Sequence, residues 1–385
     1  TATEPTYKFN ASEGIFESQT TISVTEKTPI TLYAVWAEIW DGDGTTINPY
    51  EISSKDKLSK LATQVNDKGF DYKGEHFALL GDIDLAGITW TPIGGTRSAF
   101  SGQLNGDGHT IKNLKVSTSE SYAGLFGLVK DTVIEALTIK DGNVTCERGG
   151  TSYCGGLAGG GTLTATNVHL TNVKVKSGYY AGGILGFGGG TITDCSNAGG
   201  SVEGRYAGGM TGRGSTNSSF EFIRCTNSAE IKGEAYAGGI SGDRSGEGNI
   251  FENCRNEGSV NGGIASGIAI YGQSFTACTN AGEVRGQSGM ACGITNRANY
   301  VKMCGNTGNV YGSTSSGITW HAIEIENCYN TGKVSATAGN AAAYGIAQSV
   351  RWRIKNSFTY NVDTQVPLAS NIKGGIYGDT NEVTN

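Results

Sequence analysis

Apolar residues recur along most of this 385-residue chain in short groups that alternate with Gly, Asn and other polar residues. The most regular frame has an apolar residue, a Cys three positions later, an Asn two positions after the Cys, and then a further aliphatic residue. Its copies lie 24 to 30 residues apart, at Cys195, Cys225, Cys254, Cys278, Cys304 and Cys328, with Asn197, Asn227, Asn256, Asn280, Asn306 and Asn330. Short segments rich in Val, Ile and Thr between Gly and Asn predict β-strands.

A second frame, Gly followed by an aliphatic residue, recurs with a similar period from Gly124-Leu125 to Gly345-Ile346, and Gly375-Ile376 is a tenth copy. One repeat is too short to bury its own apolar face, so successive repeats must stack. Strands one coil apart then run parallel, which predicts an all-β parallel β-helix of about ten coils, roughly 45–50 Å long. A right-handed coil is favoured because parallel crossovers prefer that hand.

The Cys position is predicted to point into the core. Earlier repeats carry Leu114, Leu137 and Val168 in the same slot, so small hydrophobes replace Cys there. Buried free thiols are therefore favoured over disulfides, and the odd total of nine Cys leaves at least one unpaired. Cys146 and Cys154 flank a loop, and their pairing stays open. The Asn column is expected to form a structural ladder of side-chain amides.

The two ends of the chain depart from the repeat. Residues 53–67 predict the one helix, with an apolar face that would cover the open first coil. We expect a small β module over 1–40, a linker and capping helix over 41–76, the β-helix over 77–356, and a cap and tail over 357–385. The first residues lack a signal-peptide pattern, so an exported protein would be present here as a mature or trimmed chain.

Composition excludes several classes of partner. The net charge is −6 and no run of Lys or Arg occurs, which argues against nucleic acid. No apolar stretch is long enough to predict direct membrane insertion. Cys-x-x-Cys and Cys/His clusters are absent, so no metal or other cofactor is expected. A monomer is expected.

Catalytic chemistry is not predicted. Carboxylates such as Asp82, Asp194 and Asp243 are not at equivalent positions of neighbouring repeats, so no acid–base pair emerges. The sequence therefore predicts no catalytic residue and no enzyme. A glycan-processing enzyme built on a β-helix is kept as a rival interpretation, and a purely structural spacer is another.

One column suggests a binding surface. Tyr122, Tyr153, Tyr180, Tyr206 and Tyr236 each stand directly before Ala-Gly or Cys-Gly and would stack on successive coils. If they face outward, they form an aromatic strip suited to sugar rings or a protein surface. If they face inward, they are a core stack, and both alternatives stay open because the glycines can break the strand alternation.

A further set of motifs follows the predicted helix: Asp82-Ile83-Asp84-Leu85, Trp90-Thr91-Pro92-Ile93-Gly94, Phe100-Ser101-Gly102, Asn105–Ile111 and Ala123-Gly124-Leu125-Phe126-Gly127. These segments resemble GLUG-motif proteins, which are bacterial surface β-helix proteins. The resemblance covers roughly 50–360 and implies a secreted or surface-anchored adhesin that binds glycan or host protein. Some members carry the motif beside an IgA-cleaving metallopeptidase, but a His-Glu-x-x-His motif is absent here, so that activity is not expected.

The N-terminal module has a resemblance of its own. Leu32-Tyr33-Ala34-Val35-Trp36 is similar to the closing part of a Listeria–Bacteroides repeat, a β-grasp-like module of bacterial surface proteins. This resemblance also implies a location at the cell surface.

Overall fold

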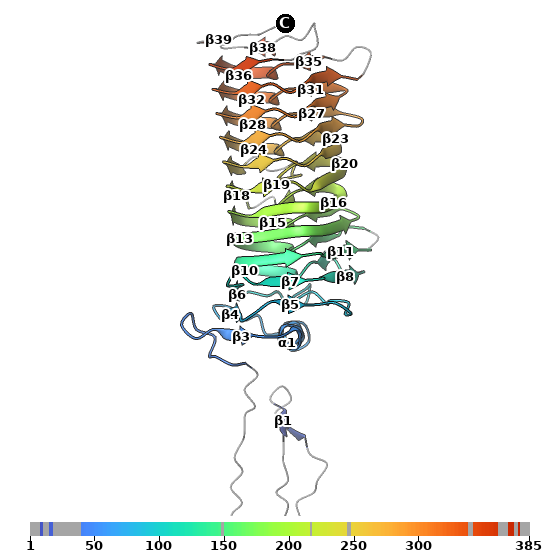
Figure 1. Ribbon diagram of the computed structural model, residues 1–385, viewed down its shortest axis with the longest axis vertical. Helices are drawn as coiled ribbons and strands as arrows, with labels where there is room; N and C mark the ends of the chain where they lie inside the picture. The colour runs from blue at the N-terminus through green and yellow to red at the C-terminus, as the bar shows by residue number, and fades with distance from the viewer. Residues whose placement is uncertain are drawn as a thin grey trace, which may run out of the picture.

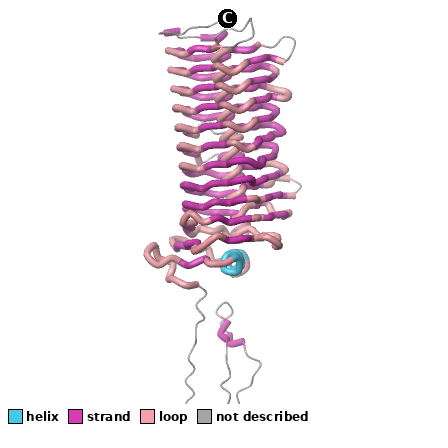
Figure 2. Tube along the Cα trace, in the orientation of Figure 1, coloured by secondary structure: helices cyan, strands magenta, loops and turns pink. Residues whose placement is uncertain are grey.

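The predicted parallel β-helix is confirmed. The computed structural model describes residues 8–10, 15–17, 40–147, 150–215, 218–244, 248–337, 342–360, 369–372 and 376–377. One 37-stranded sheet system winds through about eleven turns, one more than expected, and every strand pairing within it is parallel. Figure 1 shows the coils stacked into a straight column, and Figure 2 shows the strands of successive coils lying above one another. The right-handed winding of the β-helix stays a prediction.

Each coil contributes up to five strand positions, numbered here in chain order as columns 1 to 5. Column 1 contains β3 (Tyr50–Ile52), β4 (His76–Leu79), β6 (Gln103–Asn105), β10 (Phe126–Lys140), β13 (Ala158–Ser177), β15 (Leu185–Thr193), β18 (Phe220–Ile223), β21 (Ile250–Glu252), β24 (Ala269–Thr276), β28 (Thr295–Lys302), β32 (Thr319–Glu326), β36 (Ala347–Lys355) and β39 (Ile376–Tyr377). Column 2 contains parts of β10 and β13 with β5 (Ile83–Asp84), β7 (Thr110–Lys112), β16 (Ser196–Gly208), β19 (Thr226–Asn227), β22 (Arg255–Asn256), β25 (Thr279–Asn280), β29 (Gly305–Asn306), β33 (Tyr329–Asn330) and β37 (Phe358–Thr359).

The other columns complete each coil. Column 3 contains parts of β13 and β16 with β8 (Lys115–Thr118), β11 (Asn143–Cys146), β20 (Glu230–Gly238), β23 (Val260–Ser266), β26 (Val284–Gly286), β30 (Val310–Gly312) and β34 (Val334–Ala336). Column 4 contains parts of β16, β20 and β23 with β9 (Tyr122–Ala123), β12 (Tyr153–Gly155), β14 (Tyr180–Gly182), β27 (Met290–Cys292), β31 (Thr314–Ser316) and β35 (Ala343–Tyr344). Column 5 contains parts of β10, β13, β15, β24, β28, β32 and β36 with β17 (Thr211–Gly214) and β38 (Ala369–Ile372).

The core is a set of stacked side chains inside the coils. In column 1, Phe222 pairs in register with Phe251, and Phe251 pairs with Phe275. Their rings stack with centroids 4.8 and 4.6 Å apart, and all three side chains are fully buried. The in-register repeat therefore places like side chains on top of one another, which is what the sequence period requires.

The single predicted helix is α1 (Lys55–Asn66). It begins after Ser54, whose side chain accepts the Lys57 backbone N–H. Its buried residues are the four predicted ones, Leu58, Leu61, Ala62 and Val65. Figure 1 places α1 at the N-terminal end of the stack, where it covers the first coils.

The expected terminal modules fall mostly outside the described residues. Within 1–40 the structure describes Trp40 and an antiparallel pair, β1 (Lys8–Asn10) and β2 (Ile15–Glu17). Within 357–385 it describes residues 357–360 and the short strands β38 and β39. The division of the chain at these boundaries stays a prediction.

Candidate functional site

The five tyrosines of the sequence pattern lie in exact register in column 4. Tyr122 pairs with Tyr153, Tyr153 with Tyr180, Tyr180 with Tyr206, and Tyr206 with Tyr236. The residue after each tyrosine is fully buried in the core: Ala123, Cys154, Ala181, Ala207 and Ala237. Because side chains alternate along a strand, the tyrosines point outward. They form one surface ladder, called here the tyrosine strip.

The rings of the tyrosine strip pack against one another. The Tyr122–Tyr153 and Tyr206–Tyr236 centroids are 4.9 and 5.2 Å apart, with interplanar angles of 15° and 23°. Such stacking covers ring faces with neighbouring rings and leaves Tyr180 only 5% exposed. Interior members of the strip therefore present edges and hydroxyl groups to solvent, whereas a ring at the end of the stack keeps one face without a tyrosine neighbour.

Column 5 contributes a second row of side chains beside the strip. The Phe187 ring lies 5.1 Å from Tyr153 and 5.7 Å from Tyr180. Arg213 donates to the Tyr180 hydroxyl at 2.5 Å and lies over the Tyr180 and Tyr206 rings. Stacking on rings and a hydrogen bond fix this guanidinium in place.

The Ala-Gly-Gly segments explain how the two rows meet. Gly182 is two residues after Tyr180 and faces the same side of β14. A Cβ at Gly182 would lie 2.1 Å from the Leu185 carbonyl oxygen, and one at Gly155 would lie 2.0 Å from that of Ala158. The chain therefore bends toward its outer side at this corner. Only glycine lets the carbonyl oxygen three residues later come so close to its Cα. The surface between columns 4 and 5 is concave as a result.

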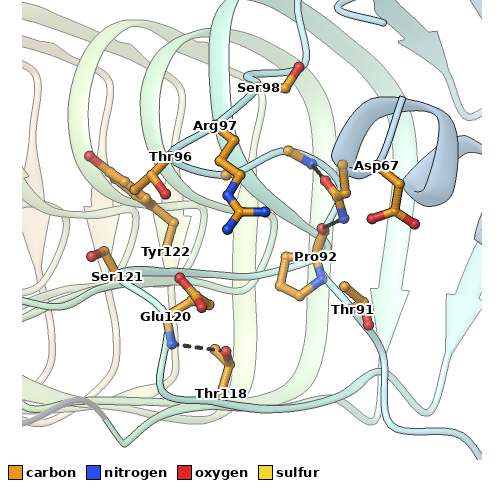
Figure 3. A pocket seen from close by; sticks show the side chains of 13 residues that line it. Asp67, Thr91, Pro92, Thr96, Arg97, Ser98, Thr118, Glu120, Ser121 and Tyr122 are labelled. Atoms are coloured by element: carbon orange, nitrogen blue, oxygen red, sulfur yellow. Dashed lines mark hydrogen bonds between the residues drawn. The ribbon is translucent and has the colours of Figure 1, made fainter. Parts of the chain in front are cut away.

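Tyr122 is the first ring of the strip and lines a pocket of about 400 Å³ at its N-terminal end. In Figure 3 the Arg97 side chain extends into this pocket, with Tyr122 and Glu120 on one side and Pro92 and Asp67 on the other. The pocket joins side chains from the end of the cap helix, from the loop before Phe100, and from the approach to β9. We call it the end pocket.

The cap helix holds one wall of the end pocket in place. Asn66, the last residue of α1, donates from Nδ2 to the Pro92 carbonyl at 2.9 Å and accepts the Gly94 N–H at 2.8 Å. Both partners belong to the segment that leads to Arg97. The position of the Arg97 loop is therefore set by α1, and the pocket depends on the helix being docked.

The end pocket is lined by both positively and negatively charged side chains. Among the described residues, Arg97 has no hydrogen bond or ion pair, and the carboxylates of Glu120 and Asp67 likewise have none. Burial raises the pKa of Tyr122 above its ordinary value, and its hydroxyl, like that of any ordinary tyrosine, is protonated at neutral pH. The pocket thus offers an aromatic ring, a cationic donor and anionic acceptors to one ligand.

A second depression of about 300 Å³ shares Tyr122 with the end pocket. Its other walls include Leu128, Phe187 and a bare stretch of backbone at Gly188 and Gly189. Leu128, Gly160 and Phe187 are register partners at outward positions of column 5. A Cβ at Gly160 would come within 2.7 Å of the Tyr122 ring, so this ring occupies the place that a side chain at Gly160 would take.

The predicted Asn column is buried and forms a chain of amides. Nδ2 of Asn227, Asn256, Asn280 and Asn306 each donates to Oδ1 of the next Asn at 2.7–2.8 Å. The last member, Asn330, donates to the Thr359 hydroxyl. Asn197 differs, because it donates to the Gly209 carbonyl instead of to Asn227. The turn after Asn197 is also unlike the others, since Gly199 and Gly200 both have positive φ.

The nine cysteines are buried free thiols, Cys146 and Cys154 included. The Sγ of Cys254 donates to the Phe222 carbonyl of the preceding coil at 3.4 Å, and Cys278 and Cys304 make the equivalent contacts. Burial raises the pKa of these three thiols well above the ordinary value. Both ladders lie inside the coils, away from the concave surface.

Sequence reasoning found the tyrosine column but missed the end pocket. Asp67, Arg97 and Glu120 each occur once, outside the repeating frames, so no periodic signal marks them. Within the described residues no group of three or more His, Cys, Asp or Glu could hold a metal ion. No helix among these described residues is long and apolar enough to span a membrane.

Two curated proteins are similar to part of this chain. A "Putative Gly-rich membrane protein" of Evansella cellulosilytica is 32% identical over 146 residues, which are 36% of this chain and 15% of that protein. "Halomucin" of Haloquadratum walsbyi is 33% identical over 160 residues, which are 38% of this chain and 2% of that protein. The chain spans only a small part of the length of either relative. No protein-family model matches the chain.

One solved structure has a similar fold. It is a "putative immunoglobulin A1 protease" from Bacteroides ovatus, with 21% identity, a TM-score of 0.49, and coverage of 88% of this chain and 86% of that one. The prediction that the present chain is not an enzyme is corrected by this finding, because a protein named as a protease has a similar fold over most of its length. At 21% identity the similarity concerns the fold and transfers neither an activity nor a catalytic residue.

Proposed function

We propose that this chain is a carbohydrate-binding adhesin segment of a cell-surface protein. The observation that carries the proposal is the end pocket, where the ring of Tyr122 lies beside Arg97 and Glu120. Sugars present apolar C–H faces and a rim of hydroxyl groups. An aromatic ring with charged donors and acceptors around it complements both parts of a sugar.

The tyrosine strip extends this contact along the column. Tyr153, Tyr180, Tyr206 and Tyr236 present hydroxyl groups at the spacing of the coils, and Arg213 lies among them. A chain of sugars that enters the end pocket would continue along the concave corner between columns 4 and 5. The strip is then a row of hydrogen-bonding groups. Stacking of a sugar ring is confined to Tyr122, because the Arg244 guanidinium lies over the ring of Tyr236 at the other end of the strip.

A location at the cell surface is part of the proposal. It is supported by the resemblance of roughly 50–360 to GLUG-motif surface proteins and by the names of the two relatives, a putative Gly-rich membrane protein and a halomucin. A straight column of coils also suits a stalk that holds a binding face away from the cell.

A glycan-array screen of the intact chain tests the function, beside the variants Tyr122→Ala and Arg97→Ala. Each variant is expected to weaken binding by about tenfold or more, which corresponds to about 1.4 kcal/mol. Tyr300→Ala is the matched control, because Tyr300 is 40% exposed in β28 and lies outside the strip and the end pocket.

Circular dichroism must first show that all four chains are folded. A folded intact chain that binds no glycan would refute the proposal and favour a structural spacer or a protein ligand. Equal binding by the intact chain and Tyr122→Ala would refute the assignment of the site.

A further inference from the structure

Column 1 contains a β-bulge in the coil of β36. The inward-facing residues Val350 and Ile354 are separated by three residues, whereas their partners in β32, Ala322 and Ile325, are separated by two. An extra residue of this kind re-aims side chains that regular alternation would place differently. Trp352 lies in the bulge, and its side chain is 51% exposed.

The exposed ring of Trp352 is held in place by a pair of charged side chains. The Arg353 guanidinium lies over the ring, 4.3 Å from its centroid. Its Nε and Nη2 also donate to Glu324 Oε1 at 2.8 and 2.6 Å, and Glu324 is only 3% exposed. A buried carboxylate therefore anchors the guanidinium that packs on the ring. Little side-chain freedom is then left to lose when a partner covers Trp352.

The surface around the bulge is cationic. Lys302 and Lys355 share the single carboxylate of Glu326, at Nζ–Oε distances of 3.7 and 3.4 Å. Arg351 is exposed in the bulge itself. Residues 295–357 contain six Lys and Arg but only two Glu and no Asp, within a chain of net charge −6. These coils therefore carry an excess of positive charge that the whole chain does not have.

These side chains form one surface on the outer side of column 1, called here the cationic face. It consists of Lys302, Arg351, Trp352, Arg353 and Lys355. Figure 1 shows their strands β28 and β36 near the C-terminal end of the column, with β32 between them. The cationic face belongs to a different column from the tyrosine strip, so an inference about it does not depend on the proposed glycan site.

We propose that the cationic face docks an acidic segment of another protein. Trp and Arg are the side chains that contribute most at protein interfaces, and here Trp352 and Arg353 lie together on an open sheet face. The surrounding cations are complementary to carboxylates, which steers an acidic partner to this face. In the complex, an apolar side chain of the partner covers the Trp352 ring, and carboxylates on either side of it contact the Lys and Arg groups.

The test measures the binding of two labelled polypeptides to the full chain by fluorescence anisotropy. One is poly-Glu, and the other is a random copolymer of Glu and Tyr of the same length. The copolymer is expected to bind about tenfold more tightly, because its tyrosine side chains can cover Trp352. Binding of both polymers should weaken as the salt concentration rises, since the charges involved are exposed.

Two variants divide the contribution of the ring from that of the charge. Trp352→Ala should bring the two polymers to within about twofold of each other, whereas Arg351→Gln should weaken both by about threefold or more. Phe70→Ala and Lys115→Gln are the matched controls, because Phe70 is 54% exposed and Lys115 is exposed in β8, both in the first coils. Neither control should change the affinity.

The outcomes decide between partners. A folded intact chain that binds neither polymer at low salt overturns the proposal, as does a preference for the copolymer that survives in Trp352→Ala. Heparin that binds more tightly than the copolymer, and less tightly to Trp352→Ala, would overturn it in favour of an anionic polysaccharide. If Trp352→Ala does not fold, hydrogen exchange of the intact chain replaces it, and the copolymer must slow exchange at residues 350–354.

Discussion

At the scale of single residues, the corners of the coil impose a backbone conformation that not every residue suits. The residue before the Cys slot has positive φ in successive coils, at Asp194, Arg224, Asn253, Ala277, Met303 and Asn327. Asn and Asp adopt this left-handed conformation readily, whereas for other side chains it costs about 1 kcal/mol of conformational free energy. The coils with Arg, Ala or Met at this corner therefore carry strain.

Met303 offers a direct test, because its side chain is 53% exposed and its φ is 55°. Met303→Asn is expected to raise the free energy of unfolding by about 0.5–1 kcal/mol, measured by urea denaturation. Met303→Val should lower it, because a β-branched side chain tolerates positive φ poorly. If neither variant changed the midpoint of urea denaturation, this corner would not be strained.

At the scale of elements, the Asn ladder ties column 2 together. Asn280 accepts from Asn256, and its Nδ2 contacts both Asn306 Oδ1 and the Gly282 carbonyl oxygen. Asn280→Ala is expected to destabilise the fold by about 2–3 kcal/mol, since it leaves buried polar groups without partners. Thermal unfolding measures the loss.

Asn261→Ala is the matched control for the ladder. Asn261 lies on the outer side of β23, next to Gly262, and should change stability by less than about 0.5 kcal/mol. Equal effects of the two variants would mean that the ladder contributes nothing beyond side-chain packing.

The same element scale shows what the sequence can predict. The coils, the tyrosine register and the Cys slot were predictable because each recurs in successive repeats within a conserved local frame, as Leu137, Val168 and Cys195 illustrate. The direction of Tyr180 was not, since the alternation breaks at the Gly182 corner. The end pocket was beyond reach, because Arg97 and Asp67 meet only through the docking of α1.

At the scale of the whole molecule, the buried thiols make stability depend on pH. The folded-state pKa of Cys254 and of its neighbours is raised by burial above the ordinary value of 9.0. Below that value both states are protonated, and the stabilisation is fully present. As pH rises above about 9 the unfolded chain releases thiol protons that the folded chain retains, so stability falls.

The urea midpoint is accordingly expected to decrease between pH 8 and pH 10. A triple variant with Val at Cys254, Cys278 and Cys304 should show a shallower decrease, because Val fills the same slot in an earlier coil and does not titrate. Parallel pH profiles for the two chains would mean that other groups set the dependence.

The parallel pairing of every coil with the next also determines how the molecule would respond to force. Hydrogen bonds between coils run along the column, so tension applied at its two ends loads them in series. The coils would then detach one at a time. Each releases 24 to 30 residues, or roughly 80–100 Å of extended chain. If such a stalk tethered a cell under flow, its stepwise lengthening would slow the cell. The force on the bond between the stalk and its ligand would then rise only after the coils had detached.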